Sequence, residues 1–221
     1  MCALVDSFRG PPRESILCFS VVAPTASRPY YESMSDKDTY LTNQFLIAMP
    51  NLRDPNFFHS VTYVCEHTEQ GAMGIVINQP VELRLGDLMA QMDMQAHDPE
   101  QAALPIFRGG PVEPERGFVL HSPLGQWESS MEVTSHIGLT TSTDIIRAMS
   151  GGSSPNDALI TLGYAGWGAG QLEQEMLDNA WLSGPADPVI IFETPVEERW
   201  EAAARLVGVN IHQLTGDAGH A

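Results

Sequence analysis

The chain has 221 residues, which suits one large domain, and 43% of them are hydrophobic, enough to form a core. Its 28 acidic residues outnumber its 11 lysines and arginines, so the formal net charge at pH 7 is −17. Such a charge is repelled by nucleic-acid phosphates and by anionic lipid surfaces, because binding to either normally rests on clustered Lys and Arg. We therefore expect no direct nucleic-acid binding and no membrane partner.

The cysteines favour a reducing compartment. Three cysteines (Cys2, Cys18 and Cys65) are too few and too scattered for a disulfide framework, and no C-x-x-C motif occurs. The sequence also contains no run of 18 or more apolar residues that could span a membrane. We expect reduced thiols and a cytoplasmic protein.

The first 38 residues differ from the rest. Residues 1–33 contain as many acids as arginines, so the whole net charge of −17 lies in residues 34–221. The apolar stretch 16–23 resembles the core of a signal peptide, but the residues before it lack the net positive charge that a signal peptide carries. We predict that residues 1–38 are an N-terminal extension, disordered or outside the native chain, and that residues 39–221 form the domain.

Strands dominate the first part of this domain. Residues 41–50 are an apolar run that predicts a buried strand, and residues 51–60 predict a loop or a single helical turn anchored by Phe57 and Phe58. Residues 60–67 alternate between apolar and polar, as a half-buried strand does. Residues 71–80 follow after a short connection, so the two segments predict a hairpin.

The middle of the domain mixes both kinds of element. Leucines and methionines recur at helical spacing in 85–92 and predict an amphipathic helix. Residues 106–112 and 116–123 predict a strand, a turn and a strand. Residues 140–152 begin with Thr and Ser and end with two glycines, which predicts a capped helix.

The last third is expected to run strand, helix, strand and helix. Residues 157–164 predict a strand, 165–170 a glycine-rich turn and 171–182 a helix. Residues 188–194 predict a short buried strand, and 194–197 predict a capping box that starts a final helix. Its apolar stripe consists of Val196, Trp200, Ala203 and Val207.

These elements together favour an α/β (α+β) sandwich. We expect a single domain with a mixed, largely antiparallel β-sheet flanked by helices.

Several ordered segments resemble the YqgE/AlgH family of small bacterial proteins. They are residues 46–67, 71–80, 108–112, 116–121 and 162–182, and the likeness runs from about residue 40 to the C-terminus. The resemblance implies an α/β sandwich in the bacterial cytosol that is monomeric or weakly associating. It also implies a loosely described regulatory role that includes alginate production. The family has no established catalytic residues, so none is carried over.

The segment 159–175 has the outline of a dinucleotide site, with a strand, glycines and a helix. However, Gln171 stands where the third glycine of G-x-G-x-x-G would be, and Glu173 and Glu175 in the first helical turn would repel a phosphate. We favour glycines that allow close packing around Trp167, and we predict no cofactor.

Cys65 and His67 suggest metal or thiol chemistry, because alternation would place both on one face of a strand. Two neighbouring ligands do not make a zinc site, which usually needs three or four. A catalytic thiolate would need a basic neighbourhood, which this acidic chain supplies poorly. We predict no metal and no catalytic residue.

The remaining possibility is that the protein recognises a partner at its surface. An aromatic residue beside flexible backbone often anchors a partner, and Trp167 together with Tyr164 and a Gly-Gly-Pro segment could frame a shallow apolar cleft. The candidate interaction cleft comprises Gly109, Gly110, Pro111, Tyr164, Trp167 and Gln171.

The sequence thus favours a non-enzymatic regulatory or interaction protein with an unknown protein partner, influencing gene expression indirectly. The alternative is an enzyme or a binder of a small, nucleotide-like ligand that uses the same cleft near Trp167.

Overall fold

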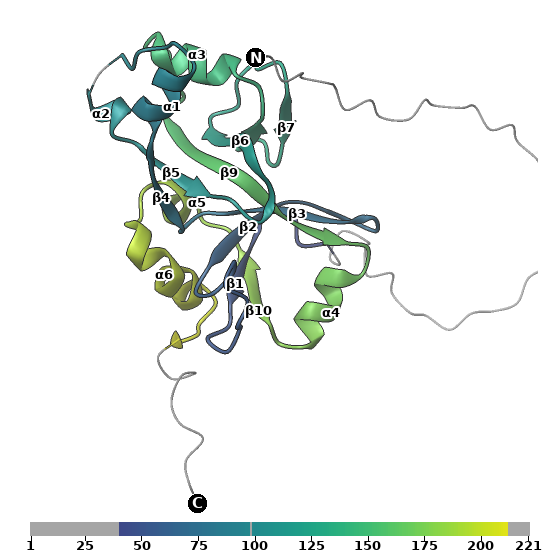
Figure 1. The fold of residues 1–221 in the computed structure, drawn as a ribbon. Helices are drawn as coiled ribbons and strands as arrows, with labels where there is room; N and C mark the ends of the chain where they lie inside the picture. The colour runs from purple at the N-terminus through teal and green to yellow at the C-terminus, as the bar shows by residue number, and fades with distance from the viewer. Residues whose placement is uncertain (1–39, 98, 212–221) are drawn as a thin grey trace, which may run out of the picture. The chain divides into compact units, whose positions relative to one another are not determined.

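Strand β9 (Asp157–Gly168) is the central strand of the fold, because other strands pair along both of its edges (Figure 1). The computed structural model describes residues 40–97 and 99–211, all within one compact unit, Ser35–Ala221. The predicted extension, residues 1–38, lies outside the described residues. Within them, one ten-stranded sheet runs in the order β10-β1-β2-β3-β9-β6-β8-β7, and β4 and β5 join it beside β9.

One half of the sheet is an antiparallel group on one side of β9. It consists of β1 (Gln44–Ala48), β2 (Val61–Thr68), β3 (Gly71–Val76) and β10 (Trp181–Pro185). Strand β1 lies between β2 and β10 and is almost wholly buried, as its apolar sequence predicts. Strands β2 and β3 form the predicted hairpin.

The other half contains the shorter strands. They are β4 (Pro80–Arg84), β5 (Pro105–Arg108), β6 (Val112–Ser122), β7 (Ser130–Glu132) and β8 (Gly138–Thr140). Among the described strands, β5 pairs with β9 in parallel and the other pairs are antiparallel. Strands β5 and β6 lie on opposite edges of β9, since Leu162 pairs with a residue from each.

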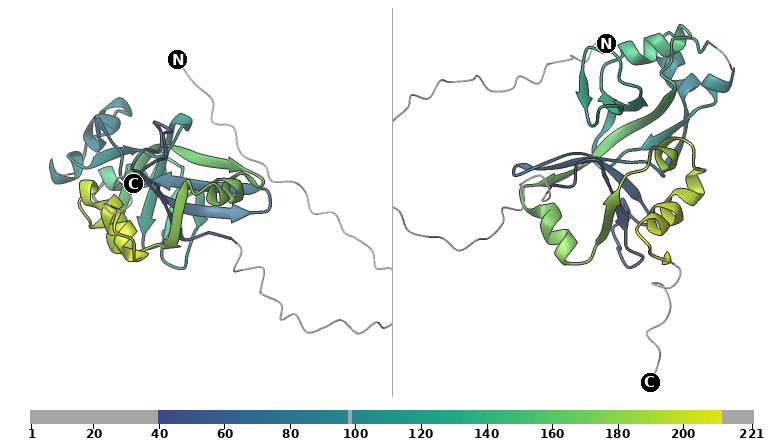
Figure 2. Two further views of the ribbon diagram at one scale, coloured as in Figure 1. Left: turned by 90° about the horizontal axis from the view of Figure 1, so that it is seen from below. Right: turned by 180° about the vertical axis from the view of Figure 1, so that it is seen from behind.

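Helices flank this mixed, largely antiparallel sheet, which confirms the predicted fold class (Figure 2). They are α1 (Leu85–Gln91), α2 (Pro99–Ala102), α3 (Asp144–Ser150), α4 (Gln171–Leu177), α5 (Pro188–Phe192) and α6 (Arg199–Leu206), with the 3₁₀ turn η2 (Val196–Glu198) before α6. Among the described helices, none combines the length and the apolar character needed to cross a membrane.

The core has three clusters, each covered by different helices. The largest cluster includes Ile191 of α5 and Ala203 of α6. The second cluster includes Leu172 of α4, and the third includes Met89 of α1 and Ile145 of α3. Helix α4 therefore covers a different cluster from α5 and α6, and Figure 1 shows these helices on separate sides of the sheet.

The predicted glycine-rich turn at 165–170 is wrong for most of its length, because β9 continues to Gly168. Ala165, Gly166 and Trp167 pair with residues of β3 along this stretch. The turn is confined to the residues just after the strand, where Gly170 adopts φ +75°, a left-handed conformation that glycine accepts readily.

The predicted strand at 188–194 is also wrong, because this segment forms helix α5. The carboxylate of Asp187 accepts a hydrogen bond from the amide of Val189, and Pro188 opens the first turn. A capping aspartate followed by proline is a strong helix start. The apolar run itself fits a buried helix as well as a strand.

Two predicted helix boundaries need correction. The helix predicted over 171–182 ends at Leu177, because Trp181 pairs with β1 as the first residue of β10. The predicted capping box at 194–197 does not form: the Thr194 hydroxyl donates to the Val189 carbonyl of α5 instead. The predicted stripe of the last helix does face the largest cluster, through Val196, Trp200, Ala203 and Val207.

Candidate functional site

The six residues of the predicted cleft do not meet at one surface. Tyr164 packs against the largest core cluster, whereas Trp167 on the same strand belongs to the cluster under α4. Their odd spacing sends the two rings to opposite faces, because side chains alternate along a strand. The segment Gly109–Pro111 lies with Tyr164, since a Cβ on Gly110 would come 2.1 Å from the Tyr164 carbonyl carbon. Gln171 lies near Trp167, because both side chains donate to the carboxylate of Glu175.

Trp167 is a core side chain, only 5% exposed, and a carboxylate on α4 holds its polar end. Its indole N–H donates to Oε2 of Glu175 at 2.9 Å, and the indole N–H of Trp181 donates to the same oxygen at 2.8 Å. The Gln171 amide donates to Oε1 of Glu175 at 3.0 Å and accepts from the Gly168 amide at 3.0 Å. These bonds fix α4 on the sheet.

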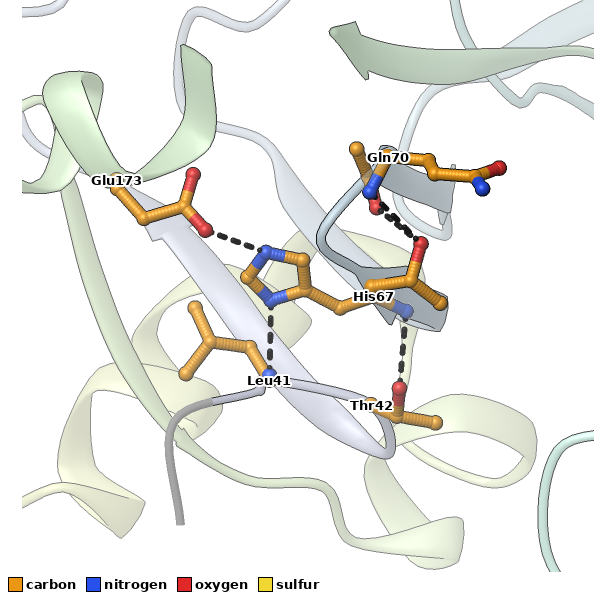
Figure 3. A network of polar contacts seen from close by, with 7 residues as sticks. Leu41, Thr42, His67, Gln70 and Glu173 are labelled. Atoms are coloured by element: carbon orange, nitrogen blue, oxygen red, sulfur yellow. Dashed lines mark hydrogen bonds and ion pairs between the residues drawn. The ribbon is translucent and has the colours of Figure 1, made fainter. Parts of the chain in front are cut away.

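A buried histidine fixes α4 from a second direction (Figure 3). Nδ1 of His67 accepts a hydrogen bond from the backbone N–H of Leu41 at 3.0 Å, so Nδ1 carries no proton. The proton of the neutral ring is therefore on Nε2, which donates to Oε1 of Glu173 at 2.9 Å. The backbone N–H of His67 donates to the Thr42 hydroxyl at 2.9 Å. Both ring nitrogens are occupied, so neither is free to act as a base.

Cys65 and His67, predicted to share a strand face, lie on opposite faces. The register of β2 with β3 shifts between Val64 and Glu66, and this bulge turns His67 toward α4, whereas Cys65 enters the largest cluster. Burial raises the pKa of the Cys65 thiol, which keeps it protonated and unreactive. Among the described residues, no group of three or more His, Cys, Asp or Glu side chains could hold a metal.

A further buried histidine is satisfied internally as well. The ring of His121 lies 3.0 Å from the Pro123 carbonyl through Nδ1 and 2.9 Å from the Thr140 hydroxyl through Nε2. A carbonyl only accepts, so Nδ1 carries the proton and Nε2 accepts from Thr140.

The α4 region does not form the phosphate site considered above. Glu173 lies in the first turn of α4 and points to His67, whereas Glu175, predicted for the same turn, lies beyond it and bonds the two tryptophans. The carboxylate in the first turn already complements the positive end of the helix and would repel a phosphate.

The structure reveals a surface feature that the sequence did not indicate. The ring of His59 stacks between Phe58, at a centroid distance of 3.8 Å, and Trp200, at 3.9 Å, each with an interplanar angle of 20°. We call these three residues the aromatic stack. Phe58 is 53% exposed and forms its outer end. We predicted that both phenylalanines of this loop anchor it to the core, but of the two only Phe57 packs against Trp167.

Hydrogen bonds hold the aromatic stack in place. His59 has φ +51°, which is costly for a residue other than glycine and persists only where the surroundings enforce it. Asn78 supplies that constraint: its amide donates to the His59 carbonyl at 2.9 Å, and its oxygen accepts from the Val61 amide at 2.8 Å. On α6, the Trp200 indole donates to the Ala48 carbonyl at 3.0 Å.

Arg199, the residue before Trp200, turns its charged side chain toward the core. The buried guanidinium of Arg199 donates to the carbonyls of Thr194 and Ile77, and it lies 5.3 Å above the ring of Phe107. Burial lowers the pKa of Arg199 to about 10, so it stays charged at neutral pH. Burial also lowers the pKa of His59, which keeps the middle ring of the stack neutral at pH 7.

Comparisons with known proteins agree with this fold. The model of the AlgH-like family (DUF179) matches residues 45–212. A UPF0301 protein of Thioalkalivibrio sulfidiphilus is 61% identical over 180 residues, which cover 81% of this chain and 96% of that protein. A UPF0301 protein of Hahella chejuensis is 52% identical over 188 residues, covering 85% of this chain and 100% of that protein.

Two solved structures are similar as well. The solution structure of the AlgH protein from Pseudomonas aeruginosa matches with a TM-score of 0.68 and 49% identity, covering 86% of this chain and 100% of that one. The crystal structure of a Corynebacterium diphtheriae protein matches with a TM-score of 0.62 over 80% of this chain and 92% of that one. At 16% identity, the second likeness concerns the fold alone.

Proposed function

This chain belongs to the AlgH-like family, and on that premise we propose that it is a regulatory protein that acts by binding a protein partner through the aromatic stack. The observation that carries the proposal is an exposed phenylalanine held at the end of a rigid stack of rings. Aromatic residues, phenylalanine among them, are enriched in protein interfaces, where a few residues carry most of the binding energy. A preorganised ring also loses little side-chain entropy on binding.

The cost of this surface supports a binding role. Leaving a large ring in water forgoes about 25 cal/mol for each Å² of apolar area that burial would remove. The left-handed backbone of His59 adds strain, and such strain is concentrated at functional sites. Phe57, one residue before Phe58, packs against Trp167, so the loop does bury one of its two rings.

We place this activity in the bacterial cytoplasm, where the protein influences gene expression indirectly. The net charge of −17 supports action through a protein rather than through DNA, whose phosphates it repels. An effect on alginate production, which the family resemblance implies, would follow from such a partner.

The test compares two exposed apolar side chains. Phe58→Ala removes the outer ring of the stack, and Leu177→Ala removes a leucine on α4 that is 76% exposed. Tagged full-length chains capture partners from a bacterial lysate, and the captured protein is then purified and titrated. We expect Phe58→Ala to weaken binding by about 30-fold or more, as loss of a hot-spot residue does, and Leu177→Ala to leave it unchanged. Equal binding by both variants would contradict the proposed function.

A further inference from the structure

We infer that the aromatic stack binds a cationic segment of its partner, with an arginine guanidinium placed on the exposed face of Phe58. This inference rests on the function proposed above and deepens it by naming the chemistry of the partner.

The first argument is the geometry of the rings. One face of Phe58 stacks on His59, so its exposed area belongs to the other face and the edge. The face of an aromatic ring carries a negative potential and attracts a cation, and arginine is the most frequent partner because its planar guanidinium stacks on the ring. Within the described part of the chain, two arginines make this contact: Arg199 lies 5.3 Å above Phe107, and Arg116 lies 5.4 Å above Phe118.

The second argument is the charge around the stack. Exposed Asp54 belongs to the same loop: its backbone carbonyl accepts the Phe58 amide at 2.9 Å, and its carboxylate accepts the backbone amide of Asn56 at 2.8 Å. Exposed Glu197 lies in the 3₁₀ turn η2, which leads directly into α6 and ends two positions before Trp200. The arginines on these elements are Arg53, which is exposed, Arg199, which is buried, and Arg205, which faces Glu201 at 3.9 Å. The neutral ring of His59 adds no positive charge at pH 7.

The same charges disfavour the other occupants of an exposed aromatic surface. A second copy of this chain would bring another −17 charges to the interface, and such like-charge approach is unfavourable. A nucleic acid or a nucleotide could stack its base on Phe58, but its phosphates would approach a chain with a net charge of −17, at a loop and a turn that carry the exposed Asp54 and Glu197. A cationic peptide gains from both the ring and the carboxylates.

The experiment uses the full chain and a short arginine–glycine repeat peptide as the probe. Its control is the same peptide with every arginine replaced by citrulline, which has nearly the same shape without the charge. Titration calorimetry at low salt should show binding of the arginine peptide, at least about tenfold weaker binding of the citrulline peptide, and weakening as salt is added, since salt screens exposed charges.

The variants separate the ring from the charge. Phe58→Leu keeps an apolar side chain but removes the ring, and it should weaken binding of the arginine peptide about two- to fivefold, the fold-change that corresponds to an exposed cation–π contact. Glu197→Gln should weaken it about two- to threefold, as expected of one exposed charge. Leu177→Ala on α4, and Glu132→Gln on β7 at the far end of the strand order, should leave it unchanged. Melting temperatures confirm that each variant folds.

Three outcomes would overturn the inference: equal affinity for the arginine and citrulline peptides, no effect of Phe58→Leu, or tighter binding of an oligothymidine than of the arginine peptide. These outcomes are distinguishable from failure of the proposed function. If capture of the natural partner depends on Phe58 but the arginine peptide does not compete for it, the inference fails and the proposed function stands. If Phe58→Ala leaves capture of the natural partner unchanged, the proposed function fails with it.

Discussion

Replacing Glu175 by alanine tests how helix α4 is held on the sheet. One oxygen of this carboxylate accepts the indole N–H groups of both Trp167 and Trp181, whose side chains are almost fully buried. Leaving a buried donor without a partner costs about 1–3 kcal/mol. Glu175 is half-buried, so water can reach part of the gap, and we expect Glu175→Ala to lower the free energy of unfolding by about 2–4 kcal/mol.

Urea denaturation followed by circular dichroism measures this loss. The matched control is Gln174→Ala on the same helix, because the exposed Gln174 side chain donates to Asp178 at the surface and should contribute less than about 0.5 kcal/mol. In a chain where both tryptophans are already phenylalanine, Glu175→Ala should cost much less, since neither buried indole N–H remains to lose its acceptor. A loss for Glu175→Ala no larger than that for Gln174→Ala would refute this account of α4.

Three further predictions concern single positions. Gly110→Ala should destabilise the fold by several kcal/mol, because the new Cβ would lie 2.1 Å from the Tyr164 carbonyl carbon. At Gly168 the nearest atom to a new Cβ would be 3.9 Å away, so Gly168→Ala should change the free energy of unfolding by no more than about 1 kcal/mol. Similar unfolding curves for the two variants would be inconsistent with this packing. Burial lowers the pKa of His59, so its contribution to stability is present above about pH 6.5 and is lost as the pH falls through the lower folded-state pKa. The melting temperature of the wild type should therefore drop more between about pH 7.5 and about pH 5 than that of His59→Phe. Parallel curves for the two proteins would count against this assignment. Cys65 is buried and its thiol pKa is raised, so it should react with an alkylating reagent only at the rate at which the chain unfolds. Mass spectrometry of the peptide that contains Cys65 measures this rate, and rapid labelling of the folded chain would disprove its burial.

Patterns within a short segment were the ones that the sequence alone could resolve. The buried strand β1 and the β2–β3 hairpin follow from apolar runs and alternation, which depend on neighbouring residues only. The stripe of α6 was found for the same reason.

Elements that depend on distant partners were missed. The glycines at 166 and 168 suggested a turn, but β3 comes close enough to pair with them, so they continue a strand. The apolar residues of α5 fit a strand or a helix equally well, and the capping by Asp187 followed by Pro188 was the local feature that decides for the helix.

The candidate site shows the same limit. Tyr164 and Trp167 are close in sequence, but alternation along a continuous strand separates them, and the mistaken turn concealed this. Phe58 and Trp200 are far apart in sequence and meet only through the folded chain. The backbone strain at His59 is likewise invisible before the structure is known.

Hydrogen–deuterium exchange of the full chain, with and without its captured partner, tests most directly whether the aromatic stack is the docking surface. The account predicts that the partner slows exchange in residues 53–60 and 196–201, which carry the stack and its acidic neighbours, and leaves residues 171–177 of α4 unchanged. Protection confined to α4, with no change around Phe58 and Trp200, would contradict it.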